Sequence, residues 1–512
     1  MNTVKNRVFT NATIVTALSI AERGLGFLYR IVLSRLIGAE GLGLYQVSLS
    51  LFSLFLTIGT GGIPITVSRM ITKSKAEKDP RGESGAVTAG LTLCLLLTLP
   101  ACLIFGFFGD KFGFLFSDER CFGVFRILLL GLCITSVYAV LRGSFWGNKQ
   151  FLLPSILEIA EEAVMVIAGV LLLQNVDSAA SGAEKAAWAV VISYVFSFVA
   201  STLCFFFHGG KLSTPKKSLK PLLNATLPLT SVRASGSLVN SAVAVLLPAM
   251  LIRAGYGETE ALKLFGIVSG MAMPILLIPS TIIGSISLVL MPELSEDFYT
   301  KNLQRLRKNV NRGLRFTFLV ACALLPFFYA LGADIGKIAF SNAEAGEIIR
   351  KSCPILLPMG LTMISTSILN SMGFEKQTFL YYFIGAAAML LCILFLPSVC
   401  GVYAYTIGLG ASYVLTGLCN LIFLHKKCNI FKKQRGQVRD HGFFVPLIAV
   451  LPIALLGQIC NVFFKNIFGE IFAFLLTALL LGLVTAIFYI AMDILPIKNL
   501  FRPLKARKKQ KV

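Results

Sequence analysis

The sequence predicts an all-α polytopic membrane protein with about 14 transmembrane helices, arranged as two six-helix lobes around a central cavity plus two extra C-terminal helices. Of its 512 residues, 56% are hydrophobic and only 14% are charged, whereas soluble proteins carry about 25% charged residues. The mean hydropathy is +0.79. Apolar runs long enough to cross a bilayer as a helix recur from end to end.

We expect the spans, in chain order, at residues 8–37, 43–71, 86–108, 122–146, 151–174, 186–207, 224–252, 264–291, 314–333, 353–373, 378–397, 401–425, 443–464 and 470–494. They predict six parts: an N-terminal lobe (1–207), a basic cytoplasmic linker (208–223), a C-terminal lobe (224–425), a basic cytoplasmic loop (426–442), two additional spans (443–494) and a basic cytoplasmic tail (495–512).

The charge distribution predicts the topology. Alternate loops, counted with both termini, hold 31 of the 47 Lys and Arg residues, and the other loops hold nine. By the positive-inside rule, both termini are expected in the cytoplasm of a bacterial cytoplasmic membrane. The net charge of +22 is therefore a topology signal, and nucleic-acid binding is not expected. The first span is too long and too charged for a cleaved signal peptide, so we expect it to be retained.

No cofactor or metal site is expected. The twelve cysteines are scattered, mostly inside spans, and form no CxxC pair. Such cysteines are typical of small apolar packing residues. The chain also has no nucleotide-binding P-loop, so we expect no ATP hydrolysis by it.

The first span carries Glu22, Arg23, Arg30 and Arg35. Ionisable residues at membrane depth cost about 2.5–3.5 kcal/mol each on insertion scales and usually face a bundle interior or a water-filled cavity. Arg23 and Arg30 are seven residues apart and share a helix face, whereas Arg35 is close enough to the span end to reach the interface. This face is expected to line a cavity for an anion.

A second set of buried charges lies in the span 151–174. Glu158, Glu161 and Glu162 follow an i, i+3, i+4 spacing and share one face. One interpretation is a salt link to Arg142 or Lys149, because charges in spans pair with one another. The other is a proton- or cation-coupling site.

The span 224–252 is polar for a membrane helix. Arg233 lies about 14 Å from its cytoplasmic edge, and Asn240 is seven residues further on the same face. We expect Arg233 to be a second cation of the anion cavity, so the predicted substrate site comprises Arg23, Arg30, Arg233, Asn240 and Glu22.

Three local features modify this pattern of straight helices. The glycines before Pro64 argue against an unbroken second span, and Pro274 and Pro279 predict a kink in the span 264–291. In the loop 292–315, apolar residues at helical spacing predict a surface-lying amphipathic helix in contact with anionic lipid; they are Leu303, Leu306, Val310 and Leu314.

The two halves are similar to one another. The stretch from Leu42 resembles the stretch from Leu262, an offset of 220, and the residues around Lys149 resemble those around Lys376, an offset of 227. Six spans per repeat give both repeats the same orientation. Transporters built in this way bind substrate at the repeat interface and rock one half against the other.

Two stretches carry a family resemblance. RGLGFLYRIVLSRLIGAEGLGLY, in the first span, and RGSFWGNKQFLLPSILEIAEE, after the fourth, resemble the MOP exporter superfamily in its polysaccharide-transport branch. This branch includes the stage V sporulation B proteins and, more distantly, the MurJ-type lipid II flippases. The resemblance covers nearly the whole chain and implies two six-helix lobes around a central cavity, with two extra helices.

The resemblance also implies a function. In MurJ-type flippases, arginines of the first and seventh spans serve a lipid-linked pyrophosphate. Arg23 matches the first arginine of their R-x-L-G-F motif, Arg30 lies one position later than their second, and Arg233 has a comparable depth. The implied function is a flippase for an undecaprenyl-pyrophosphate saccharide such as lipid II, in spore cortex or cell-wall synthesis. The implied partners are the lipid-linked oligosaccharide, membrane lipids and cell-wall polymerase machinery, with a monomer as the default.

Three other interpretations remain open. A cation-coupled multidrug exporter of the same superfamily would use carboxylates in its cavity, and Glu22 is available for this role. A membrane-embedded glycan enzyme would need a catalytic constellation in a sizeable external loop, which the short external loops do not offer. A non-transporting scaffold of the envelope machinery would gain nothing from the cost of buried arginines.

Overall fold

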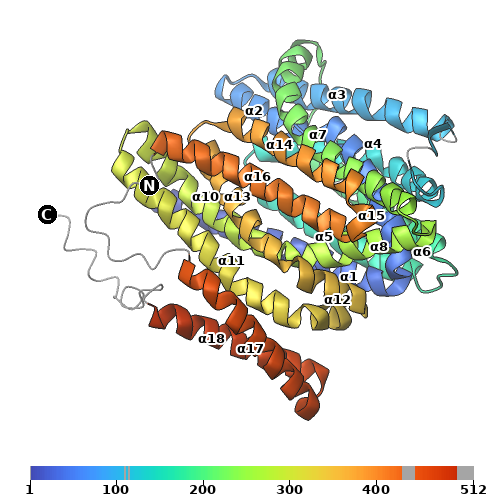
Figure 1. Cartoon of the computed structure of the whole chain (residues 1–512). Helices are drawn as coiled ribbons and strands as arrows, with labels where there is room; N and C mark the ends of the chain where they lie inside the picture. The colour runs from blue at the N-terminus through green and yellow to red at the C-terminus, as the bar shows by residue number, and fades with distance from the viewer. Residues whose placement is uncertain (1, 109–110, 114–115, 429–443, 493–512) are drawn as a thin grey trace. The chain divides into compact units, whose positions relative to one another are not determined.

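The computed structural model describes residues 2–108, 111–113, 116–428 and 444–492, and every regular element in these ranges is helical (Figure 1). The α-helices are α1 (Asn2–Thr60), α2 (Ile63–Ala76), α3 (Pro80–Phe107), α4 (Arg120–Gly147), α5 (Leu152–Leu172), α6 (Ala179–Phe207), α7 (Lys216–Arg253), α8 (Glu258–Phe265), α9 (Met273–Leu276), α10 (Ile278–Tyr299), α11 (Leu303–Phe340), α12 (Ala343–Ser352), α13 (Leu356–Ser371), α14 (Glu375–Phe395), α15 (Pro397–Cys400), α16 (Tyr403–Cys428), α17 (Phe444–Phe468) and α18 (Glu470–Ala491).

The predicted all-α polytopic membrane protein is confirmed. Within the described residues, 13 helical stretches are long and apolar enough to cross a membrane. Two predicted spans run together in the stretch 14–76, and the predicted span 264–291 falls on two stretches. The predicted span 151–174 corresponds to α5. This helix is not among the 13 stretches, and it contains three glutamates.

The first helix contains a break at Gly38. This residue has φ 70° and ψ −178° inside the range of α1, a conformation that glycine adopts without the steric cost of a Cβ. Beyond the break, Glu40 accepts a 2.6 Å hydrogen bond from Arg120 at the start of α4. Glu22, which precedes the break, and Thr60, which ends the helix after it, line the same pocket. The two arms of α1 therefore double back on each other, as expected for two separate spans.

The glycine-rich stretch before Pro64 separates α1 from α2. The helix ends at Thr60, and α2 begins at Ile63 with Pro64 in its first turn, where proline costs no intrahelical hydrogen bond. The backbone N–H of Gly62 donates instead to Thr230 Oγ1 of α7, at 3.0 Å. The expected interruption is present, and it brings the α1–α2 junction onto α7.

The span with Pro274 and Pro279 is also interrupted, as expected. After α8 the backbone forms a π-helix over Gly266–Ala272 and then the short helix α9, before α10 begins at Ile278. A π-helical turn lacks the regular i to i−4 bonding and commonly marks a bend.

The predicted surface-lying helix around residue 310 is wrong. Leu306, Val310 and Leu314 belong to the first turns of the 38-residue helix α11 and are 0–4% exposed. They pack against Ile283 and Leu294 of α10. Their periodicity marks a buried face, because the α10–α11 turn folds these two helices against each other.

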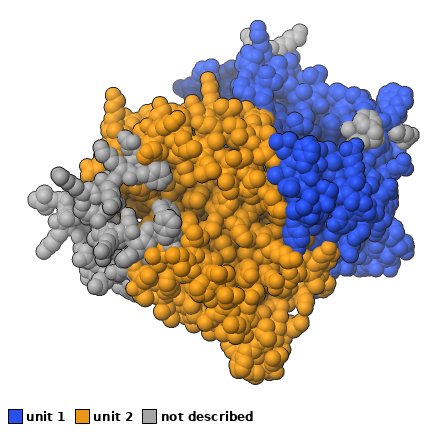
Figure 2. Space-filling model, viewed as in Figure 1, with its two compact units in different colours: residues 1–271, 390–405 blue, residues 272–389, 406–512 orange. Residues whose placement is uncertain are grey.

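Contacts divide the chain into two compact units (Figure 2): residues 1–271 with 390–405, and residues 272–389 with 406–512. The six-part division at residues 207, 223, 425, 442 and 494 stays a prediction. Most of the predicted basic loop 426–442 and the whole tail 495–512 lie outside the described residues.

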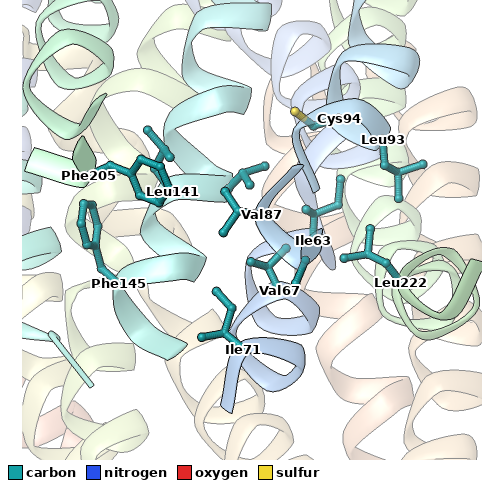
Figure 3. Packing of buried hydrophobic residues seen from close by; sticks show 12 residues of the cluster. Ile63, Val67, Ile71, Val87, Leu93, Cys94, Leu141, Phe145, Phe205 and Leu222 are labelled. Atoms are coloured by element: carbon teal, nitrogen blue, oxygen red, sulfur yellow. The ribbon is translucent and has the colours of Figure 1, made fainter. Parts of the chain in front are cut away.

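The core of unit 1 joins α2, α3 and α4, with contributions from α6 and α7. Its buried members include Val67, Val87, Leu141 and Phe205 (Figure 3). By contrast, many large apolar side chains are exposed, such as Phe207 at 85%. Soluble monomers seldom expose so much apolar surface, and in a membrane protein this surface faces acyl chains.

Candidate functional site

Unit 1 contains an acidic pocket of about 240 Å³. Glu158, Glu161 and Glu162 enter it from α5, Arg142 from α4 and Glu22 from the first arm of α1. The wall is completed by Leu56, Thr60, Thr135, Tyr138, Ala139 and Tyr194. The structure therefore brings together five of the nine residues predicted for the substrate and coupling sites.

Helix periodicity and a glycine explain why these groups meet. The i, i+3, i+4 spacing places the three α5 glutamates on one face, and α1 packs against that face. A Cβ on Gly26 would lie 2.6 Å from Glu162 Oε1, so glycine allows α1 to approach this closely. The sequence motif and the close contact together form the acidic wall.

Arg142 pairs with one member of this wall. Its Nη1 donates a 2.7 Å hydrogen bond to Glu158 Oε1. The guanidinium also lies over two aromatic rings of its own helix, 5.0 Å from the Trp146 centroid and 5.9 Å from the Tyr138 centroid. These cation–π contacts hold Arg142 in position against α5.

The pocket has more acidic charge than one arginine neutralises. Four carboxylates line it, and Glu161 Oε2, Tyr138 Oη and Arg142 Nε are buried without a hydrogen-bond partner among the described residues. Buried polar atoms are normally satisfied, so Glu161 Oε2 favours a bound proton, cation or water, whereas the Arg142 Nε–H, which can only donate, favours water. The pocket itself repels a pyrophosphate, because like charges at close range are unfavourable.

The first-span arginines lie beside this pocket. Arg30 is partly buried and interacts electrostatically with Glu162 and Tyr45. Arg23 is exposed, interacts with Glu22 and has no ion pair within 4.0 Å among the described residues. Although they are seven residues apart, the two arginines therefore differ in their surroundings: Arg30 is partly buried near Glu162, and Arg23 is exposed.

The seventh helix packs on the second arm of α1 through hydroxyl groups. Ser237 Oγ lies 2.8 Å from Thr57 Oγ1, and Ser241 Oγ donates to the Ser50 carbonyl at 2.7 Å. Arg233 and Asn240 flank this contact, and both are exposed. They lie outside the acidic pocket, so the structure does not join them to Glu22.

Several pocket residues were missed by the sequence reasoning. Tyr138 lies one helical turn before Arg142, and this i, i+4 relation could have revealed it. Thr60 and Tyr194 gave no such signal, because their place in the pocket depends on the reversal of α1 and on the packing of α6. Within the described residues, no group of three His, Cys, Asp or Glu side chains is arranged to hold a metal ion.

Known proteins resemble this chain in sequence and fold. The family described as "Polysaccharide biosynthesis protein" matches residues 8–298. Stage V sporulation protein B of Bacillus subtilis (strain 168) is 25% identical over 369 residues, covering 69% of this chain and 70% of that protein. The lipid II flippase MurJ in an inward closed conformation superposes with a TM-score of 0.71 at 15% identity, covering 94% of this chain and 100% of MurJ.

The fold extends to drug transporters. A multidrug resistance MATE family transporter of the MOP superfamily, in an inward-facing conformation, superposes with a TM-score of 0.68 at 14% identity, covering 81% of this chain and 96% of that chain. The 13 apolar helical stretches of the described residues and these likenesses define a multi-pass membrane protein with the fold of these transporters. The family match covers more than half of the sequence, and the chain belongs to the polysaccharide biosynthesis protein family.

Proposed function

We propose that this protein is a flippase that moves an undecaprenyl-pyrophosphate saccharide, such as lipid II, across the bacterial cytoplasmic membrane by alternating access. It serves spore cortex or cell-wall synthesis as a monomer, with both termini in the cytoplasm and cell-wall polymerase machinery as a partner. The likeness to stage V sporulation protein B and to the lipid II flippase MurJ supports this proposal.

One observation carries the proposal: the position of Arg233. This residue is exposed near the middle of the 38-residue helix α7, about 25 Å from its first residue, and has no ion pair within 4.0 Å among the described residues. A charged arginine at this depth is costly against hydrocarbon. It is stable where its surface faces a water-filled path and an anion passing along it.

The chemistry of the cargo fits the exposed arginines. A pyrophosphate is a concentrated anion, and guanidinium groups bind it through forked, charge-assisted hydrogen bonds while staying charged. Arg23 and Arg233 supply such groups, and Asn240 offers an amide to the saccharide. The polar headgroup crosses along this face while the polyprenyl tail remains in the lipid.

The acidic pocket supplies the coupling step. Glu161 and Glu162 take up a proton or small cation, and this neutralisation lowers the repulsion among four carboxylates. Glu158 stays paired with Arg142. Since Glu162 and Arg30 interact, loading of the pocket frees Arg30 to turn toward the anion.

The proposal is tested in liposomes that contain a fluorescent undecaprenyl-pyrophosphate saccharide. The rate at which the headgroup becomes accessible to an impermeant reagent is measured for the protein and for Arg23→Ala, Arg30→Ala and Arg233→Ala. We expect protein-dependent exposure that falls by about tenfold or more in Arg233→Ala, because each charge-assisted contact contributes about 1.5–3 kcal/mol.

Arg69→Ala is the matched control, since Arg69 is an exposed arginine in the middle of α2. It should transport at the parental rate. If the headgroup still becomes accessible at the parental rate in all three test variants, the flippase function stands and the proposed arginine site is wrong. If this protein does not make the headgroup accessible even with an imposed ion gradient, while a control flippase does, the flippase function is rejected.

A second candidate is a cation-coupled multidrug exporter. The acidic pocket favours it, since organic cations and coupling ions both bind carboxylates, and the MATE fold supports it. The same liposomes, loaded with a fluorescent organic cation, separate the two functions. Gradient-driven cation efflux without headgroup exposure would establish the exporter.

A further inference from the structure

A second pocket lies at the predicted cytoplasmic end of unit 1, apart from the acidic pocket. Its volume is about 410 Å³. It lies between the end of α2, the first turns of α3 and the residues that follow α4 and α6. The chain around it is held in place by hydrogen bonds: Ser213 Oγ contacts Ser84 Oγ at 3.0 Å, and the Ser213 N–H donates to Thr88 Oγ1 at 3.0 Å.

Polar groups without partners line this pocket. Lys75 at the end of α2, Glu83 of α3 and Lys211 after α6 all line it. Among the described residues none of these three has an ion pair within 4.0 Å, whereas the nearby Lys73 pairs with its own helix neighbour Glu77 at 3.7 Å.

One buried polar atom of the pocket also lacks a hydrogen-bond partner. Gln150 Oε1 is buried and accepts no hydrogen bond from any described residue. A buried, unsatisfied acceptor costs about 1–3 kcal/mol, so its position in a pocket wall points to a ligand that donates a hydrogen bond. The two lysines favour an anion, and Gln150 Oε1 favours a hydroxyl or amine on the same ligand.

Part of the remaining wall is apolar, and Ser84, Ser144, Asn148 and His208 complete it. Ile71, Val87, Phe145 and Phe205 form the apolar part and belong to the unit 1 core (Figure 3). Directly before the pocket residue His208, the α6 side chain Phe207 is 85% exposed. Because α6 is a candidate membrane span, we expect this end of the helix at the boundary between acyl chains and water.

We propose that this pocket binds the headgroup of an anionic phospholipid that carries free hydroxyls, of the phosphatidylglycerol type. Lys75 and Lys211 contact the phosphodiester, Gln150 Oε1 and Glu83 accept hydrogen bonds from the glycerol hydroxyls, and the apolar wall contacts the first carbons of the lipid. Basic pockets between membrane helices on the cytoplasmic side bind anionic headgroups in this manner. The site is independent of the proposed transport function.

The test is native mass spectrometry of the full-length protein in detergent, titrated with dihexanoyl-phosphatidylglycerol and, separately, with the phosphatidylcholine analogue. We expect phosphatidylglycerol to bind at least tenfold more tightly than phosphatidylcholine. Lys75→Gln/Lys211→Gln should weaken its binding about tenfold, because each lysine near a membrane surface contributes appreciably to anionic-lipid binding.

Lys73→Gln/Lys78→Gln is the matched control, with the same net charge and two exposed lysines outside the pocket. It should bind within about twofold of the parent. Equal affinities in the two double variants would overturn the site, because binding would then follow net charge alone.

Two further binding measurements identify the ligand. Gln150→Leu should reduce the preference for phosphatidylglycerol over phosphatidic acid, which lacks the glycerol hydroxyls, and an unchanged preference would remove Gln150 from the site. Glycerol 3-phosphate binding as tightly as the lipid would overturn the lipid as occupant in favour of a soluble phosphate. Elution of all variants at the parental volume in size-exclusion chromatography establishes that they are folded.

Discussion

Gly43 of α1 and Gly266, which follows α8, occupy the same narrow gap between two crossing segments. A Cβ on Gly43 would lie 2.1 Å from the Leu262 carbonyl oxygen, and a Cβ on Gly266 would lie 2.1 Å from the Ala39 carbonyl oxygen. Small residues let membrane helices approach through their backbones. Leu42 and Leu262 head the two stretches that resemble each other, so similar segments meet at this crossing.

Gly43→Ala should therefore destabilise the protein by about 1–3 kcal/mol, since the added methyl group meets backbone and cannot be accommodated by a side-chain rotation. The thermal midpoint in detergent would fall, and Gly266→Ala should behave in the same way. Gly482→Ala is the control, because no atom lies within 4 Å of its Cβ position. A Gly43→Ala midpoint equal to the control would show that the helices separate readily.

The ion pair in the acidic pocket gives a second prediction. Arg142→Met leaves Glu158 among three other carboxylates, and we expect a loss of about 1–3 kcal/mol in the free energy of unfolding. This loss is smaller than for a fully buried pair, because the two side chains are 31% and 21% exposed.

Arg142→Met/Glu158→Gln should recover most of that loss, because it removes the charge that was left without a partner. Thermal midpoints of the parent, the single variants and the double variant form a double-mutant cycle. Additive losses in this cycle would mean that the 2.7 Å contact contributes nothing of its own.

The proposed coupling role of the pocket predicts the behaviour of Glu161→Gln. An amide is nearly isosteric with the carboxylate but cannot take up a proton, so the variant should fold normally and lose the response of headgroup exposure to an imposed proton or sodium gradient. The measurement compares exposure rates with and without the gradient. Glu184→Gln is the control, since Glu184 belongs to α6 and does not line the pocket. A gradient response equal to the parent would place coupling elsewhere.

The C-terminal hairpin of α17 and α18 is attached to α11 by a buried polar contact. Asp334 is 4% exposed and accepts hydrogen bonds from Asn461 and Lys465 of α17. Asp334→Ala leaves Lys465 and Asn461 without their partner, and since the Lys465 side chain is 28% exposed this should cost about 1–3 kcal/mol, less than for a fully buried pair.

Limited proteolysis of the detergent-solubilised protein is expected to release α17 and α18 faster in Asp334→Ala than in the parent. Lys337→Ala, an exposed change on the same helix, should keep the parental rate. Asp334→Asn/Lys465→Gln should restore the attachment, and failure to restore it would show that charge, and not hydrogen bonding, holds the hairpin.

Much of the fold could be predicted from the sequence, because membrane insertion depends on a local sum of side-chain hydrophobicity along one helix. Local sequence likewise predicted the glycine break before Pro64, the interruption near Pro274 and the shared face of Glu158, Glu161 and Glu162. The prediction for Leu306 and Val310 was wrong, because the same apolar periodicity is found in a helix on a lipid surface and in a helix buried against α10.

The sequence by itself determined that this chain is a helical membrane protein with charged residues inside its apolar spans, because hydropathy and charge are properties of each segment alone. Only the tertiary structure decided which charges meet. The reversal at Gly38 brings Thr60 to Glu22, and α4 selects Glu158 as the partner of Arg142. Such contacts depend on the rotation and tilt of each helix against its neighbours, and packing across several spans sets both.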